Sequence, residues 1–164
     1  MDLEQDWPEI RRIFARAPYS SIASVDADGL PHVSPIGSLV LLKEPGRGFY
    51  FERFTANLPR HLEREANLCA MAVDMRLSLW LKALLRGGFP AAPGLRLAGR
   101  ASELRDATER EVELFQRRVR PVRWTKGYQL LWSGLARGRE VHFDRVVPLR
   151  IGRMWPPPAD LAAA

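Results

Sequence analysis

A strand-like stretch near the amino terminus carries residues that suit a ligand lying along the backbone. It reads Pro31-His32-Val33-Ser34-Pro35-Ile36-Gly37 and follows the turn sequence Asp26-Ala27-Asp28-Gly29. Proline has no N–H to donate to a neighbouring strand, so Pro35 indicates a sheet edge or a bulge. Gly37 has no side chain, which lets another group approach the backbone closely. The pattern predicts a binding strand.

A second stretch, residues 51–62, combines groups that bind phosphate. Phe51 ends an aromatic strand, Thr55 supplies a hydroxyl, and Asn57 can cap a short helix. The first amides of a helix have no partner within it and attract anions. Arg53 and Arg60 lie close in sequence, and arginine binds phosphate through paired hydrogen bonds. These features predict a phosphate-binding loop, although Arg60 also fits a solvated helix residue.

Several classes of chemistry find no support in the sequence. The three histidines, His32, His61 and His142, lie in separate segments without Cys or Glu at ligand spacing, which argues against a structural zinc or a metalloprotease. There is no G-x-S-x-G elbow, no P-loop and no G-x-G-x-x-G. We therefore predict no metal and no catalytic nucleophile.

Composition limits the setting and the partners. The chain has 164 residues, one cysteine (Cys69) and a net charge of +6, and only Lys43, Lys82 and Lys126 of its 25 basic residues are lysines. A lone cysteine excludes an internal disulfide, and we expect neither a signal peptide nor a membrane span, which favours the cytoplasm. No basic run is interleaved with aromatic residues, so we do not expect nucleic acid as a partner.

Most of the predicted elements are strands joined by short turns. In the first half, an amphipathic helix with an Asp6–Glu9 capping box precedes strands over 20–26, 32–42 and 49–51, a helix from Asn57, and a strand over 68–73 that we expect to be buried on both faces. In the second half, we expect a helical excursion over 77–85, a strand over 95–104, a helix with an Asp106–Glu109 capping box, a helix over 128–135, and two terminal strands meeting near Asp144 and Arg145. About six strands joined in this way favour an antiparallel barrel over a parallel α/β sheet.

The order of these elements over residues 10–74 resembles the FMN-binding split barrels related to pyridoxamine phosphate oxidase, with a looser match over 95–104 and 141–155. The resemblance implies a mainly β (β+α) fold, a six-stranded antiparallel split β-barrel with peripheral helices. It places one FMN-binding domain at residues 1–155 and a flexible Pro/Ala-rich tail at 156–164. It further implies a homodimer with FMN at the subunit interface.

Carried over position by position, the resemblance also implies a set of cofactor-binding residues. Flavin contacts would come from His32, Val33, Ser34, Pro35, Ile36, Phe51, Glu52 and Arg53, and phosphate contacts from Thr55, Asn57 and Arg60, with Leu58 and His61 beside them. This chain departs from the oxidases at two places. Ser34 stands where they have an arginine, and Ala56-Asn57-Leu58 stands where they have Ser-Arg-Lys.

The predicted function is therefore that of an FMN-binding flavoprotein, a flavin-dependent oxidoreductase acting on an unidentified small molecule. A deazaflavin-dependent reductase of the same fold and a non-enzymatic binding or regulatory protein are the alternatives. We do not expect oxidation of pyridoxamine phosphate, because no histidine follows His142 to form the substrate-binding arginine and histidine pair of the oxidases. The apolar stripe over 77–85 must be covered by core or by a partner, which also favours a homodimer.

Overall fold

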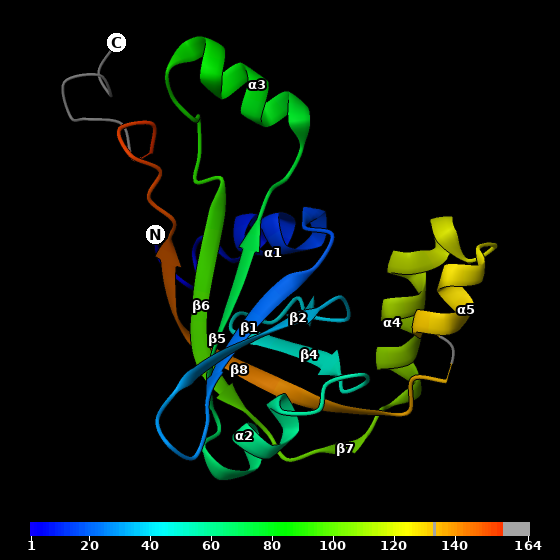
Figure 1. The fold of residues 1–164 in the computed structure, drawn as a ribbon. Coiled ribbons are helices and arrows are strands. Elements are labelled where there is room, and N and C mark those ends of the chain that lie inside the picture. Colours follow the sequence, from blue (N-terminus) through cyan, green and yellow to red (C-terminus); the bar gives the residue numbers. More distant parts are fainter. Residues whose placement is uncertain (133, 156–164) are drawn as a thin grey trace.

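One antiparallel sheet, with strands drawn from most of the chain, forms the centre of the molecule (Figure 1). The computed structural model describes residues 1–132 and 134–155, and the predicted tail over 156–164 lies outside them. Six strands of five to twelve residues are β1 Ser20–Val25, β2 Pro31–Ile36, β4 Arg47–Phe51, β5 Asn67–Val73, β6 Gly94–Ala101 and β8 Arg137–Pro148. Two further strands, β3 Val40–Leu41 and β7 Arg105–Asp106, have two residues each. The predicted antiparallel split barrel is confirmed, with these two short strands added.

The helices lie around this sheet. They are α1 Trp7–Arg16, α2 Leu58–Arg64, α3 Leu77–Arg86, α4 Glu109–Val119 and α5 Lys126–Trp132, with a 3-10 turn over Arg120–Val122. Figure 1 shows α3 projecting beyond one end of β5 and β6, while α4 and α5 lie beside each other on one flank. No helix in the described part of the chain is long and apolar enough to span a bilayer.

Chain connectivity forces the sheet to curl. The strand order is β2-β1-β5-β6-β8-β4-β3, so the two edge strands are consecutive in sequence and only residues 37–39 join them. A flat sheet of seven strands would hold its edges about 29 Å apart, at about 4.8 Å per strand. A link of this length spans at most about 14 Å. The edges must therefore approach each other, which closes the sheet into a partial barrel.

Strand β4 separates two clusters of core residues. Tyr50 faces the barrel interior with residues such as Ile22 and Leu97, whereas Phe49 and Phe51 face outward and pack with α4. β4 is therefore the strand buried on both faces. The prediction that residues 68–73 form such a strand is wrong, because β5 alternates between buried and partly exposed residues, as expected for a sheet with one uncovered face.

The carboxy-terminal part of the sheet also differs from the prediction. Residues 137–148 form one strand rather than two, and the bend expected near Asp144 is a β-bulge at which β8 gains one residue against β6. Gly99 lies opposite the bulge, where a Cβ atom would be 2.1 Å from the His142 carbonyl oxygen. The bulge bends the strand without ending it.

Two predicted capping boxes do not form, and a third does. The Asp6 carboxylate accepts a hydrogen bond from the Asp2 amide instead of capping α1. At α4 the capping residues are Thr108 and Glu111, two positions later than predicted. The short strand β7 occupies the positions just before this cap, which moves the helix start along the chain.

Candidate functional site

A cleft of about 470 Å³ lies along the edge strand β2. One wall is β2 and the link that follows it, residues 33–38, and the opposite wall comes from α5 and the residues after it. Residues 53–55, which follow β4, form its floor, and Pro18 and Tyr19 lie at one side. Its size falls within the range of about 300–1,000 Å³ that is typical of small-molecule sites.

The predicted edge position of Pro35 is confirmed. β2 pairs only with β1, where Pro35 lies opposite Ser21, so its missing N–H interrupts no ladder on the free side. Behind this strand, the Ser38 hydroxyl donates to the Phe51 carbonyl oxygen and accepts from the Phe51 amide, both at 3.0 Å. These bonds fix the β2–β3 link, which belongs to the first wall, against the end of β4.

The floor of the cleft carries buried polar atoms without partners. Arg53 Nη1 and Thr55 Oγ1 are both shut off from solvent and form no hydrogen bond within residues 1–132 and 134–155. Between them, Phe54 has a φ of 63°, a left-handed conformation that costs a non-glycine residue about 1–2 kcal/mol. The Phe54 ring is exposed and lies 4.7 Å from the Arg53 guanidinium carbon. An unpaired buried polar group costs about 1–3 kcal/mol, so this loop is well suited to an incoming ligand with acceptor oxygens.

The far wall depends on the packing of α5. Trp132 lines the cleft and packs edge-on against Phe115 of α4, and Tyr128 packs against Trp132 in turn. Tyr128 and Trp132 therefore pack against α4, and Trp132 also contributes to the cleft. Trp124 differs, because its ring is exposed.

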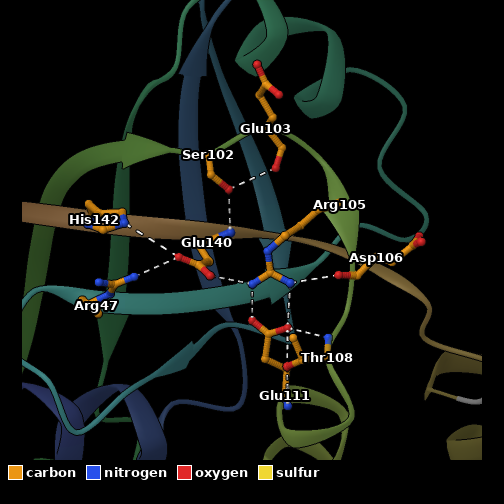
Figure 2. A network of polar contacts seen from close by, with 9 residues as sticks. All are labelled: Arg47, Ser102, Glu103, Arg105, Asp106, Thr108, Glu111, Glu140 and His142. Atoms are coloured by element: carbon orange, nitrogen blue, oxygen red, sulfur yellow. Dashed lines mark hydrogen bonds and ion pairs between the residues drawn. The ribbon is translucent and has the colours of Figure 1, made fainter.

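A cluster of charged residues fastens α4 to the sheet (Figure 2). Arg105 donates to Glu111 at 2.6 Å and to Glu140 of β8 at 2.7 Å, and Arg47 donates to the other oxygen of Glu140 at 3.0 Å. The hydrogen bond from Arg105 holds the pKa of Glu140 below its usual range. Thr108 and Glu111 complete the capping box at the start of the helix. The cluster positions α4, and through it the wall formed by α5.

Seven of the thirteen predicted binding residues line the cleft. They are Val33, Ser34, Pro35, Ile36, Phe51, Arg53 and Thr55. The other six, His32, Glu52, Asn57, Leu58, Arg60 and His61, are not among its lining residues. Their role in binding a cofactor stays a prediction.

The structure gives most of these six residues other surroundings. Leu58 is fully buried in the barrel core, while Asn57 makes no side-chain cap bond and Arg60 is exposed. Glu52 accepts a hydrogen bond from Arg139, at 3.1 Å, and both side chains are almost fully buried. Burial raises the pKa of the neighbouring Tyr50 above its usual range.

His32 and His61 lie against each other, with ring centres 4.7 Å apart. Sequence reasoning separated them because His61 follows His32 by 29 positions in the sequence. Among the described residues, no group of three or more His, Cys, Asp or Glu side chains could hold a metal ion.

Other lining residues were not predicted at all. Tyr19, Phe54 and Leu131 join the cleft from three different parts of the chain. No local pattern marks a phenylalanine that will adopt a positive φ, and the place of α5 depends on contacts between α4 and β4.

The sheet order, the curled shape and the peripheral helices define an antiparallel split β-barrel protein. A family model described as pyridoxamine 5'-phosphate oxidase matches residues 7–146. The chain therefore belongs to the pyridoxamine 5'-phosphate oxidase family, as its sequence resemblance predicted. Among curated proteins there is no match.

Solved structures support the same fold. An FMN-binding protein from Syntrophomonas wolfei superimposes with a TM-score of 0.61 at 15% identity, covering 92% of this chain and 90% of the other. HupZ from Group A Streptococcus gives 0.59 at 18% identity, covering 88% and 94%. An F420 reductase gives 0.55 at 12% identity, covering 84% and 94%. At these identities the likeness shows the fold alone.

Proposed function

We propose that the cleft along β2 binds FMN and that the protein is a flavin-dependent oxidoreductase acting on a small molecule. The observation that carries the proposal is the floor of the cleft, where Arg53 Nη1 and Thr55 Oγ1 are buried and have no hydrogen-bond partner among the described residues. A cationic donor beside a hydroxyl suits a phosphate group. The family match and the likeness to an FMN-binding protein are consistent with this choice of ligand.

The residues present fit the two parts of such a ligand. Val33, Pro35 and Trp132 form apolar walls for a flat ring, and Arg53 with Thr55 would hold the phosphate. When bound, the flavin would supply the redox chemistry, and the protein would orient it and exclude water. Because the floor of the cleft is already arranged around Arg53 and Thr55, binding would satisfy groups that otherwise destabilise the folded chain.

We propose a homodimer in which a second copy covers the open side of the site. Val33, at the mouth of the cleft, is exposed. Helix α3 exposes Leu77, Leu81, Leu84 and Leu85, although Trp80 and Ala83 pack inward. An apolar surface of this kind is typical of a protein interface. A monomer in light scattering at micromolar concentration would contradict the dimer.

We place the protein in the cytoplasm, on the evidence of its single cysteine.

The test is a titration of the purified apoprotein with FMN and, in parallel, with riboflavin. FMN should bind saturably and quench its own fluorescence, and riboflavin should bind more weakly because it lacks the phosphate. No saturation at millimolar flavin would overturn the site. Mass identification of any small molecule released from the purified protein separates FMN from a deazaflavin. Oligonucleotide binding with a steep salt dependence would instead favour the regulatory alternative.

A further inference from the structure

Two of the three histidines meet at the end of the barrel formed by the β1–β2 hairpin and α2. His32 lies at the start of β2 and His61 lies in α2, and their rings are 4.7 Å apart and tilted by 53°. The His32 side chain is 40% exposed, so solvent and ions can reach it. Neither histidine lines the cleft along β2.

Each ring is held by one of its two nitrogens. His32 Nε2 lies 2.8 Å from Asp26 Oδ2, and His61 Nδ1 lies 2.9 Å from the hydroxyl of Ser24, which is buried. The second nitrogen of each ring, Nδ1 of His32 and Nε2 of His61, has no hydrogen-bond partner in the part of the chain that the structure describes. In metal sites, one imidazole nitrogen binds the ion and the other is held by a carboxylate or similar group, which fixes the ring.

The Asp26 carboxylate is well placed to act as such a supporting group. Its Oδ1 accepts from the amides of Asp28 and Leu30, which fixes the carboxylate in the turn and leaves Oδ2 for His32. An ionised carboxylate on one nitrogen makes the other nitrogen a better metal ligand.

The spacing of the two rings matches shared coordination. Imidazoles bound to one ion at about 2.0–2.1 Å, with an angle of about 90–110° at the metal, have ring centres about 4.5–5.2 Å apart. The observed 4.7 Å lies within this interval.

We propose that His32 and His61 bind one divalent transition-metal ion, with Asp26 and Ser24 holding the two rings. Imidazole ligands favour ions such as Zn²⁺, Cu²⁺, Ni²⁺ and Co²⁺. Because no third protein ligand is available among the described residues, water or an external molecule fills the remaining positions. The site is therefore exchangeable and open to ligands rather than structural. The proposal departs from the sequence analysis, which predicted no metal because the histidines lie far apart in sequence. It does not depend on flavin binding.

The first test uses the wild-type protein without a histidine tag and after treatment with a chelator. The chain has only three histidines, so its imidazole signals in a proton NMR spectrum are few. Substoichiometric Cu²⁺ should broaden two of the three before the third, which belongs to His142. Equal broadening of all three, or none, would overturn the proposal.

The second test measures Zn²⁺ binding by calorimetry in matched variants. One ion per chain should bind, and His61→Gln and His32→Gln should each weaken binding by about tenfold or more, with Asp26→Asn weakening it by about tenfold. His142→Gln is the control, because that side chain is exposed on β8 and lies beside Glu140, away from the other two histidines. Cys69→Ser should also bind normally, since burial raises the pKa of the thiol and keeps it protonated. Unchanged binding in the His32→Gln, His61→Gln double variant would exclude this site. Thermal unfolding without metal checks that each variant is folded.

Discussion

Arginine serves two different purposes in two regions of the molecule. In the charged cluster of Arg47, Arg105, Glu111 and Glu140, each of the two guanidinium groups has a carboxylate partner (Figure 2). In the loop of residues 53–55, by contrast, Arg53 Nη1 and Thr55 Oγ1 are buried without partners, and Phe54 adopts a left-handed conformation. The first arrangement stabilises the fold, whereas the second costs stability. The difference indicates that the loop, not the cluster, is where a ligand contributes the missing contacts.

The largest expected effect is on stability, at the buried ion pair of Arg139 and Glu52. Arg139→Met leaves the Glu52 carboxylate buried without a cation, so we expect a loss of about 3–5 kcal/mol in the free energy of unfolding. Urea unfolding measures this loss. The Glu52→Met, Arg139→Met double variant should recover most of it, because no uncompensated charge remains. A small effect of the single substitution would show that the pair is not a structural ion pair.

The second prediction concerns the loop. Arg53→Gln should weaken FMN binding by about 1.5–3 kcal/mol, the usual contribution of a hydrogen bond to a charged group, while the affinity for riboflavin stays nearly unchanged. The free energy of unfolding without ligand should not fall, because within the described residues Arg53 Nη1 forms no hydrogen bond that the substitution could remove. Fluorescence titration and urea unfolding give the two values.

Arg60→Gln is the matched comparison for Arg53→Gln. Arg60 is exposed on α2 and does not line the cleft, although the family resemblance implies that it contacts the phosphate. If its removal cost more FMN affinity than the removal of Arg53, the phosphate would lie at the start of α2. The contrast between the loop and the charged cluster would then fail.

The third prediction compares two helix starts, one inside the charged cluster and one outside it. Thr108→Ala removes the capping hydrogen bond of α4 and should cost about 1 kcal/mol in the free energy of unfolding. Asp6→Ala at the start of α1 should cost less, since its side chain caps no helix amide. Thermal or urea unfolding of both variants checks the order, and equal losses would contradict the assignment of the caps.

Much of the fold could be predicted from sequence because its signals are local. The Asp26–Gly29 turn, the proline-bearing edge strand and the amphipathic stripe of α1 each follow from neighbouring residues. The errors arose where contacts between residues far apart in sequence determine the burial or the length of a strand. Burial of β4 on both faces requires α4, and the single strand β8 requires β6 opposite the bulge at Asp144.

The site was predicted in part for the same reason. Val33, Pro35 and Arg53 belong to continuous segments, so a local pattern could mark them. The wall from α5 could not be predicted, because it depends on packing between Phe51, Phe115 and Trp132, which are far apart in sequence. The meeting of His32 with His61 likewise follows from the closure of the barrel.

The smallest expected effect is a pH dependence that belongs to the charged cluster and not to the loop. The Arg105 hydrogen bond lowers the pKa of Glu140 in the folded protein, so the ionised carboxylate contributes stability above its unfolded pKa of about 4.3. That contribution is lost as the pH falls through the lower folded value. Wild type and Arg105→Gln should therefore differ most in stability near neutral pH, and the difference should shrink below about pH 4. Because Arg105 and Glu140 are partly exposed, the effect should also diminish at high salt. Urea unfolding at several pH values measures it, with Arg53→Gln as the control, whose difference in stability from wild type should not vary with pH. If the difference in the free energy of unfolding between Arg105→Gln and wild type stayed constant down to acidic pH, Arg105 would act through packing and not through its charge.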